Sequence, residues 1–433
     1  MSNILKILLI FVLTTSCSLN KGPKFWSKKE VAQEKLVKAK EIFKKKEALN
    51  LEFNPSLKIK LYSKLINNSF LNNLDNNNGR INFNGELQSI SRYKFKKIEN
   101  LHRYEPEIMF NKDNIIFFDN KGSILNFDKH SNLIWKKNYY SKTEKKQKPI
   151  LFFAKSNNIL IVADNIAKLY ALDINTGELL WTKKNTAPFN SQIKIYKNKF
   201  FVIDFENTLK AHLIKNGTEV FNLKTQDSLI RSQKKLSMVI VKEKIYFNNS
   251  LGDISAVDIS SGELIWQSPT QSNLVYDSGF FLKTSDIVAN HGKLYFSNNQ
   301  NQFFSLDMQT GSLNWQQKIN SSLRPTVIND YIFTVTLEGY LAVIEKNSGN
   351  IIRITDIFQQ FKSKKRIKIK PTGFIVGSEN IYISTSNGRL LKVDINSGKI
   401  KSTLKINGNA ISRPTIINQN LYTISENSII KLN

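Results

Sequence analysis

A short pattern repeats along this sequence, and its spacing limits the possible folds more than any other feature. Residues 171–181 read Ala-Leu-Asp-Ile-Asn-Thr-Gly-Glu-Leu-Leu-Trp, and the same spacing of Asp, Gly and Trp returns at 256–266 and 305–315. Weaker copies begin near positions 128, 211, 345 and 394, so the mean interval is about 44 residues. Intervals of about 40–45 residues are typical of the four-stranded blades of a β-propeller. The sequence therefore predicts a ring of such blades.

Each copy of the pattern lies between two apolar runs, such as 168–172 and 178–181, so it is predicted to be the loop of a β-hairpin. The glycine supplies the left-handed backbone conformation that the loop needs near its end, and the Asp side chain can accept hydrogen bonds from backbone amides of the turn. The Trp that follows offers a broad flat face to the adjacent blade.

The two ends of the chain are predicted to complete one blade together. The sequence stops near the position where an eighth copy would place its Asp, so the last blade lacks an outer strand. The alternating run Ser91–Ile98 precedes the first full repeat and can fill this gap. Five of the nine prolines open apolar runs and are predicted to mark strand entries: Pro106, Pro149, Pro325, Pro371 and Pro414. We expect an all-β, eight-bladed propeller of four-stranded antiparallel blades over residues 90–433, closed by an N-terminal strand.

The first residues have the features of an export signal. Lys6 precedes the apolar run Ile7–Leu13, which is too short for a helix that crosses a bilayer, and small residues lead to the lone cysteine, Cys17. This run resembles the lipobox of bacterial lipoproteins, although that pattern usually has Leu three places before the cysteine. The resemblance implies a signal peptide over 1–16, acylation of Cys17 and a position at the periplasmic face of the outer membrane. Cleavage of an unacylated periplasmic protein is the alternative.

Residues 17–50 are predicted to hold the lipid anchor and an amphipathic helix with a capping box at Ser27 and Glu30. The apolar face of this helix comprises Ala32, Leu36, Ala39 and Phe43. The helix either rests on anionic headgroups or packs against the main domain. Residues 51–89 form a linker to which the sequence assigns no structure.

Charge and composition bear on the possible partners. The chain has 63 Lys and Arg against 35 Asp and Glu, a net charge of +28, which favours anionic surroundings. Because the lysines are spread along the whole chain, no nucleic-acid surface is expected. A polyanion such as lipopolysaccharide is one possible ligand, since Arg324, Lys370 and Arg413 precede prolines at equivalent places. These three cations either surround one end of the central channel of the propeller, or they form local hydrogen bonds and ion pairs with carbonyls and carboxylates between blades.

The repeat resembles that of the quinoprotein (PQQ-type) propellers, and the resemblance covers about 340 residues. Quinoprotein dehydrogenases usually have a vicinal cysteine pair and a bound calcium, whereas Cys17 is the only cysteine here and the four histidines are scattered. A lipoprotein signal followed directly by a propeller is similar to the BamB family of outer-membrane protein assembly lipoproteins. This resemblance implies a non-enzymatic scaffold without cofactor, metal or catalytic residues. Its partners would be BamA, other barrel-assembly subunits and nascent outer-membrane proteins.

The same resemblance also implies a partner-binding site. In the BamB family a loop with Leu, Leu and Arg docks onto BamA, helped by acidic residues of the following blade. The matching positions here are Leu229, Ile230 and Arg231, with Asp286 as the nearest acidic match, and Ser232 stands where the family usually has Gly. Two aliphatic side chains beside an Arg form a plausible small hot spot. The other interpretations are ordinary inter-blade loops, a PQQ-dependent oxidoreductase, or a periplasmic polyanion-binding propeller.

Overall fold

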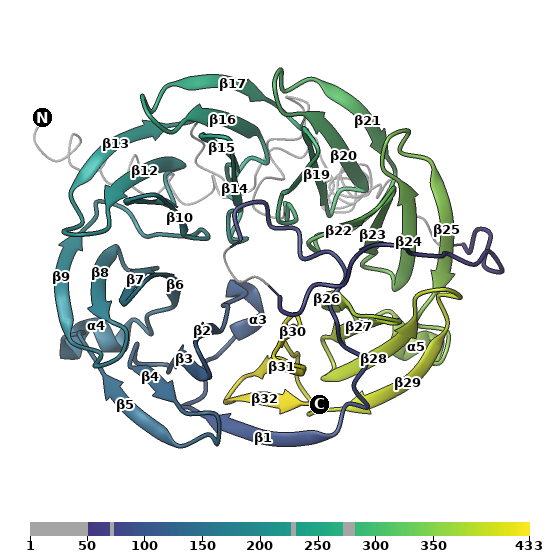
Figure 1. Ribbon diagram of the computed structural model, residues 1–433, viewed down its shortest axis with the longest axis horizontal. Coiled ribbons are helices and arrows are strands. Elements are labelled where there is room, and N and C mark those ends of the chain that lie inside the picture. The colour runs from purple at the N-terminus through teal and green to yellow at the C-terminus, as the bar shows by residue number, and fades with distance from the viewer. Residues whose placement is uncertain (1–50, 70–72, 227–230, 272–281) are drawn as a thin grey trace, which may run out of the picture. The chain divides into compact units, whose positions relative to one another are not determined.

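The strands are arranged as a ring of blades around a central axis (Figure 1). The structure is a computed structural model that describes residues 51–69, 73–226, 231–271 and 282–433. Within these residues there are eight four-stranded sheets, and all strand pairs inside them are antiparallel. The prediction of an eight-bladed propeller is therefore confirmed.

Each blade has one strand next to the axis and three further strands that follow it outward to the rim. Blades 1 to 4 comprise, from the axis outward, β2 (Met109–Asn111), β3 (Asn114–Phe118), β4 (Ile124–Phe127) and β5 (Leu133–Lys137); β6 (Leu151–Ser156), β7 (Ile159–Asp164), β8 (Lys168–Asp173) and β9 (Leu179–Lys184); β10 (Lys194–Tyr196), β11 (Lys199–Ile203), β12 (Thr208–Leu213) and β13 (Glu219–Lys224); and β14 (Met238–Val241), β15 (Lys244–Asn248), β16 (Ile254–Asp258) and β17 (Leu264–Ser268).

Blades 5 to 7 repeat this order, and blade 8 uses both ends of the propeller. The strands are β18 (Val288–Asn290), β19 (Lys293–Asn298), β20 (Gln302–Asp307) and β21 (Leu313–Gln317); β22 (Thr326–Ile328), β23 (Tyr331–Val335), β24 (Tyr340–Glu345) and β25 (Ile351–Asp356); β26 (Pro371–Val376), β27 (Asn380–Thr385), β28 (Arg389–Asp394) and β29 (Ile400–Lys405); and β30 (Thr415–Ile417), β31 (Asn420–Ser425), β32 (Ser428–Leu432) and β1 (Ser89–Lys94).

The closing strand β1 pairs with β32, with Tyr93 opposite Ile429. The strand thus begins and ends earlier than the predicted run Ser91–Ile98, because the chain leaves the sheet after Lys94 and leads to the helix α3 (Leu101–Tyr104). Closure by an N-terminal strand is confirmed. Joining the ends in one sheet leaves no open seam in the ring.

The repeated Asp and Gly have separate tasks in each loop. The Oδ1 atom of Asp173 accepts hydrogen bonds from the backbone amides of Asn175 and Thr176, both at 2.9 Å. Gly177 has a φ of +73°, and a Cβ there would lie 2.9 Å from the Trp135 ring of the preceding blade. The glycine is therefore needed both for the turn and for the neighbouring aromatic ring.

The repeated Trp joins one blade to the next. The indole N–H groups of Trp181, Trp266 and Trp315 donate to carbonyls of the following blade, those of Ile214, Met308 and Lys346, at 3.0–3.1 Å. Tyr93 makes the equivalent contact across the closing seam, because its hydroxyl donates to the carbonyl of Lys129 at 3.2 Å. In blade 6 the buried Arg353 replaces the aromatic residue and donates to the Ile395 carbonyl at 2.9 Å.

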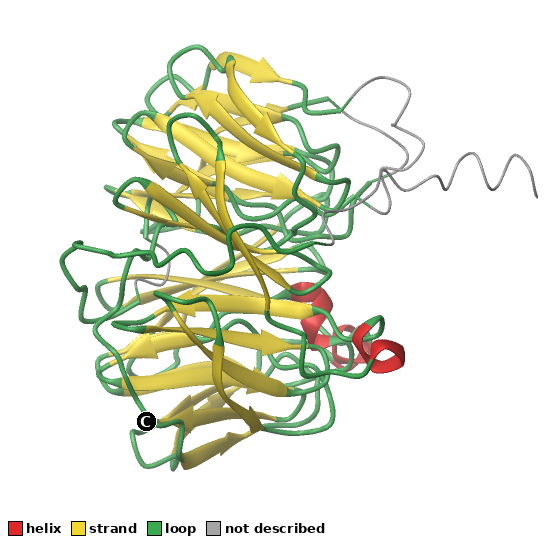
Figure 2. Ribbon diagram, turned by 90° about the vertical axis from the view of Figure 1, so that its right-hand side faces the viewer, coloured by secondary structure: helices red, strands yellow, loops and turns green. Residues whose placement is uncertain are grey.

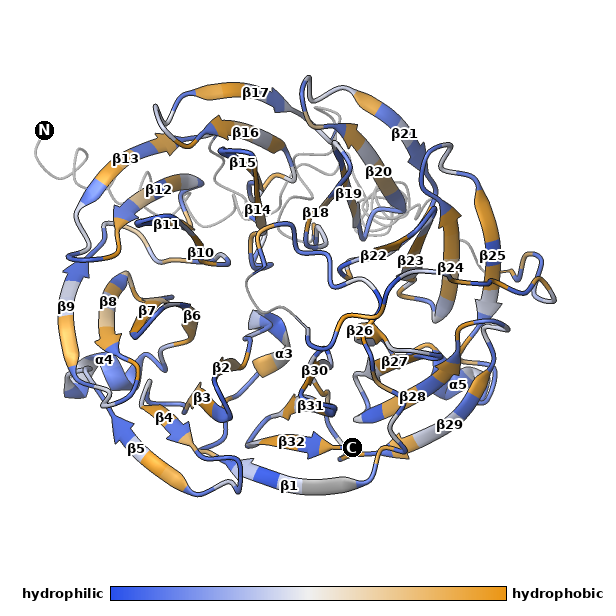
Figure 3. Ribbon diagram, in the orientation of Figure 1, coloured by the Kyte–Doolittle hydropathy of each residue, from blue (hydrophilic) through white to orange (hydrophobic). Residues whose placement is uncertain are grey.

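The two faces of the ring carry different elements (Figure 2). We call one the helix face: it holds the loops that connect the outer strand of one blade to the inner strand of the next, with α3, α4 (Lys142–Lys146) and α5 (Ser363–Arg366). We call the other the extension face, because the segment before β1 crosses it over the middle of the ring (Figure 1). Figure 3 shows apolar residues mainly along the strands and hydrophilic residues in the loops.

The described residues before β1, 51–69 and 73–88, are hydrogen-bonded to the inner strands. Backbone hydrogen bonds of 2.7–2.9 Å join them to the inner strands of four blades, through the pairs Ser69–Ile416, Leu74–Ile240, Asp75–Ala289 and Ile81–Val376. The amide of Asn76, which is 1% exposed, donates to the carbonyl of Ile287 at 2.9 Å. This segment therefore covers one end of the central channel.

In the described part of the chain, no helix combines the length and the apolar character needed to span a bilayer. The predicted signal peptide, Cys17 and the predicted amphipathic helix before residue 50 lie outside the described residues, and they remain predictions.

Candidate functional site: the helix face and the mouth of the channel

Two neighbouring loops of the helix face contain the residues predicted to bind a partner. The loop between β13 and β14 leads from blade 3 to blade 4, and the loop between β17 and β18 leads from blade 4 to blade 5. Leu229 and Ile230, in the first loop, lie outside the described residues. Arg231 is described: it is half-buried, and its guanidinium lies 6.0 Å from the centre of the Phe205 ring.

Ser232, at the position where the resemblance to the BamB family predicts Gly, connects these two loops. Its hydroxyl donates to the carbonyl of Leu282 at 2.5 Å and accepts a hydrogen bond from the amide of Lys234 at 3.1 Å. The side chain is 4% exposed. Ser in place of the predicted Gly therefore has a structural role, because the hydroxyl fixes the base of one loop to the base of the other.

Asp286 is placed inside the channel mouth rather than on the surface. It is 6% exposed, and one of its carboxylate oxygens accepts from Nη2 and Nε of Arg324 at 2.5 and 2.6 Å. The same oxygen lies 3.3 Å from the amide nitrogen of Gln192. Its role in partner binding stays a prediction, but the structure shows that its direct contacts are made within the protein.

Asp286 belongs to a group of buried and half-buried charges that we call the channel cluster: Glu105, Glu107, Lys234, Lys235, Asp286 and Arg324. Arg324 also lies 3.2 Å from the carboxylate of Glu107, which in turn lies 3.3 Å from Nζ of Lys235. Lys234 forms an ion pair with Glu105. These pairs connect blades 1, 4, 5 and 6 across the axis, so the cluster holds the two candidate loops to the rest of the ring.

Glu107 and Asp286 stay charged although the surrounding protein excludes most of the water from them. Burial alone would raise the pKa of Glu107, but the positive charges of Lys235 and Arg324 outweigh it and lower the pKa to about 2. The pKa of Asp286 is also held well below its usual range, because Arg324 and Lys235 outweigh the effect of burial. At neutral pH both groups are therefore anionic and paired.

Two cations near the axis show the opposite effect. Burial, together with the charge of Arg324, lowers the pKa of Lys194 to about 7 and that of Arg413 to about 9. Nζ of Lys194 donates to Oδ1 of Asn76 at 2.6 Å, so this lysine connects the channel to the segment that covers its other end. The three residues considered for a basic ring therefore differ: Arg324 and Arg413 line the channel, whereas Lys370 is exposed outside it.

The sequence did not reveal Glu107, Lys235 or Lys194 as parts of this site. Glu107 and Lys235 share a position with most of the charged residues of the channel mouth, because they stand two or three places before an inner strand, whereas Lys194 is the first residue of β10. The shared position holds for Glu107 before β2, Lys235 before β14, Asp286 before β18, Arg324 before β22 and Arg413 before β30. Such a signal is readable only after the inner strands have been assigned.

Fold and site together define a propeller of the PQQ-like class. The family model described as "Outer membrane protein assembly factor BamB" matches residues 120–355, more than half of the sequence. The chain belongs to this family. No curated protein matches the sequence.

Solved structures of the same fold include a BamB protein and several dehydrogenases. BamB from Moraxella catarrhalis has a TM-score of 0.62 and 17% identity, and the match covers 80% of this chain and 100% of that one. A quinohemoprotein alcohol dehydrogenase from Comamonas testosteroni has a TM-score of 0.61 and 9% identity, covering 82% and 78%. A europium-containing methanol dehydrogenase has a TM-score of 0.63 and 12% identity, covering 82% and 88%. At these identities the likeness concerns the fold alone.

The channel residues do not fit a PQQ and metal pair of the dehydrogenase kind. The cavity at the channel mouth has a volume of about 80 Å³, well below the roughly 300 Å³ at which small-molecule pockets begin. Among the described residues, no three His, Cys, Asp or Glu side chains are grouped so that they can hold a metal ion. The carboxylates Glu107 and Asp286, which such an ion would need, are already paired with Arg324.

Proposed function

We propose that this protein is a non-enzymatic scaffold of the outer-membrane β-barrel assembly machinery. It binds BamA and other subunits of that machinery as well as nascent outer-membrane proteins, and it aids the folding and insertion of these proteins. The observation that carries the proposal is the family match over residues 120–355, which includes both candidate loops. The sequence before residue 50 supports a lipid anchor at Cys17 and a location at the periplasmic face of the outer membrane.

The proposed contact consists of Leu229, Ile230 and Arg231 on a rigid base. The aliphatic side chains fill an apolar pocket of BamA, and the guanidinium forms forked hydrogen bonds with a carboxylate there. Asp286 acts as a positioning residue, because its ion pair with Arg324 fixes the end of the adjacent loop. A base that is already ordered reduces the entropy lost on binding.

The affinity of the purified full chain for the periplasmic domains of BamA tests this proposal. Arg231→Ala is expected to weaken binding at least ten-fold, since loss of a central Arg in a hot spot costs about 2 kcal/mol or more. Arg103→Ala is the matched control, because Arg103 is an exposed arginine of α3 on the same face, and binding should be unchanged. Equal affinity of both variants would reject the site, and absence of binding by the unaltered chain would reject the function.

A quinoprotein oxidoreductase is the second candidate, and the likeness to two dehydrogenase structures is what favours it. The paired channel carboxylates and the small cavity speak against it. Titration of the protein with PQQ and Ca²⁺ separates the candidates, because the scaffold proposal predicts no saturable change in PQQ absorbance. Saturable binding accompanied by dye reduction with an alcohol would replace the scaffold by an enzyme.

A further inference from the structure

The loop that contains α5 presents a dense group of cations on the helix face. Lys362, Lys364, Lys365, Lys368 and Lys370 are all exposed. Within the described part of the chain, none of these five lysines forms an ion pair with a carboxylate. The side chain of Ile367, in the middle of the group, is 77% exposed. The loop therefore presents an aliphatic side chain surrounded by cations, which is the combination of groups found in segments that bind at the surface of an anionic bilayer.

The loop that contains α5 is fixed to the propeller on its inner side. The guanidinium of Arg366 lies 2.5 Å from the carboxylate of Asp356 and 5.1 Å from the centre of the Tyr340 ring. Ile369 is 5% exposed and belongs to an apolar cluster of blades 6 and 7. With Arg366 and Ile369 anchored, the exposed position of Ile367 and of the lysines follows from the fold.

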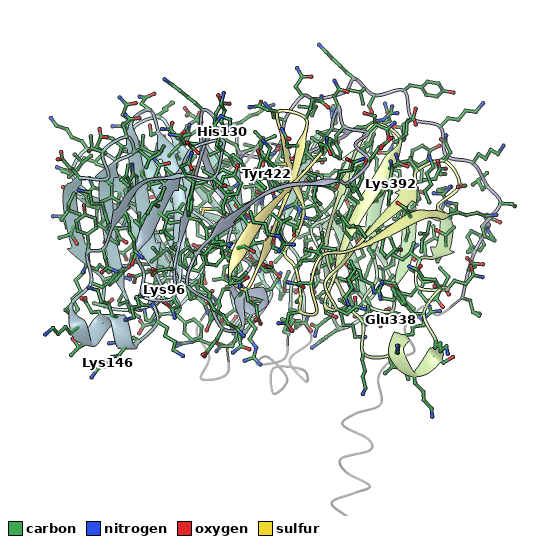
Figure 4. All side chains as sticks on the ribbon, turned by 90° about the horizontal axis from the view of Figure 1, so that it is seen from below. Lys96, His130, Lys146, Glu338, Lys392 and Tyr422 are labelled. Carbon is green, nitrogen blue, oxygen red and sulfur yellow. The ribbon has the colours of Figure 1, made fainter. Side chains whose placement is uncertain are left out.

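A second group of exposed lysines lies on the same face, and we call each of the two groups, the one at α5 and the one at α4, a basic point. Lys142 and Lys146 of α4 are exposed, and Figure 4 shows Lys146 on the side of the ring from which α5 also projects. The only acidic residue of α4, Glu144, is used within the fold: it accepts from the amide of Ser141 at 2.7 Å and lies 3.5 Å from Nζ of Lys168. The charge that α4 presents to its surroundings is therefore positive.

The separation of the two basic points bears on the shape of the partner. The helix α4 connects blades 1 and 2, whereas α5 connects blades 6 and 7, so three blades separate them one way around the ring and five the other. A flat anionic surface can contact both points at once, while a short polyanion reaches one. The exposed Ile367 adds an apolar group, which gains nothing from a soluble polyanion but enters the boundary between headgroups and acyl chains.

We propose that the helix face rests on a phospholipid bilayer through these two basic points, with the lysines on lipid phosphates and Ile367 inserted between headgroups. Each basic residue near an anionic bilayer strengthens binding about five-fold, so several lysines acting together give stable but salt-sensitive contact. The inference goes beyond the proposed function, because none of these residues belongs to the proposed BamA contact. It also places the bilayer on the face that carries Arg231.

Sedimentation with vesicles tests the proposal. The full chain is used with Cys17→Ser, so that no acyl chain contributes, and the vesicles contain phosphatidylcholine and phosphatidylglycerol at a ratio of about 3:1. Lys364→Glu/Lys365→Glu should lower the partition coefficient at least ten-fold, and Ile367→Ser about three-fold or more. Lys129→Glu/Lys215→Glu is the matched control: both lysines are exposed in hairpin loops of the extension face, and the change in net charge is the same.

Three results would overturn the proposal. An equal loss in the control pair would show that only net charge matters. An unchanged partition of Ile367→Ser would show that no apolar insertion takes place. Loss of binding to heparin in Lys364→Glu/Lys365→Glu, with binding to vesicles retained, would assign the surface to a soluble polyanion. Because the affinity for BamA should stay the same in all of these variants, failure here leaves the proposed function untouched.

Discussion

Replacing Arg324 by Met should destabilise the propeller more than replacing an exposed charged residue would. The side chain is 7% exposed and pairs with the buried carboxylate of Asp286 at 2.5 Å and with the half-buried carboxylate of Glu107 at 3.2 Å. Met removes the charge but keeps an apolar stem, so both carboxylates lose their shared cation. Removal of one partner from a buried ion pair typically costs about 3–5 kcal/mol. For a domain of this size, this corresponds to a fall of the melting temperature of about 4–7 °C.

The lowered pKa of Glu107 gives a second, independent value for the free energy that the ion pairs of the channel cluster contribute to folding. In the folded state it is lowered from 4.5 to about 2, which is worth roughly 3 kcal/mol at neutral pH. Because the folded-state pKa is the lower one, this contribution is complete above pH 4.5 and is lost as the pH falls through about 2. The difference in stability between the unaltered chain and Arg324→Met should therefore shrink when urea denaturation is moved from pH 7 to pH 3.

Arg366→Met is the matched control for Arg324→Met. Arg366 also lies 2.5 Å from a carboxylate, that of Asp356, but its side chain is 25% exposed. A partly solvated pair of this kind is worth about 1 kcal/mol or less. Equal destabilisation by the two substitutions, or a difference that does not depend on pH, would refute the reasoning about the channel cluster.

Three further substitutions test the ring itself. Gly311→Ala should cost about 1–3 kcal/mol more than Gly292→Ala in urea denaturation: the two glycines have similar φ values of +73° and +77°, but only a Cβ at Gly311 meets the ring of Trp266, at 2.6 Å. Equal costs would mean that this contact between blades does not matter. Tyr93→Ala should cost about 3–5 kcal/mol, measured as a shift of the melting temperature, because it removes a fully buried ring that contacts Phe127 across the closing seam. Asn76→Ala should expose the segment that covers the channel to proteolysis, since it removes the amide that donates to Ile287; unchanged protection would contradict that role.

The fold could be predicted from the sequence because the residues that determine each hairpin loop lie close together in the chain and recur from blade to blade. Asp173 and Gly177 determine one loop, and the residues that interact within it are at most five places apart. The same loop recurs in most blades, so the period and the number of blades follow. The closing strand was also predictable, because the last blade is visibly one strand short.

The candidate site was predictable only in part, because its contacts join distant residues without a shared spacing. Arg324 is 38 residues from Asp286 and 217 from Glu107. Nothing in the pattern shows that Asp286 turns inward to Arg324 and away from the surface. Asn76 lies in a polar segment without periodicity, so its place at the axis could not be predicted either.

Photocrosslinking in intact cells tests the central claim most directly. A photoreactive amino acid at position 230 should crosslink to BamA, while the same residue at the exposed position 215, in a hairpin loop of the extension face, should not. BamA crosslinked from position 230 alone is the predicted result. Crosslinks to BamA from both positions, or from neither, would contradict the proposal that the loops of the helix face bind it.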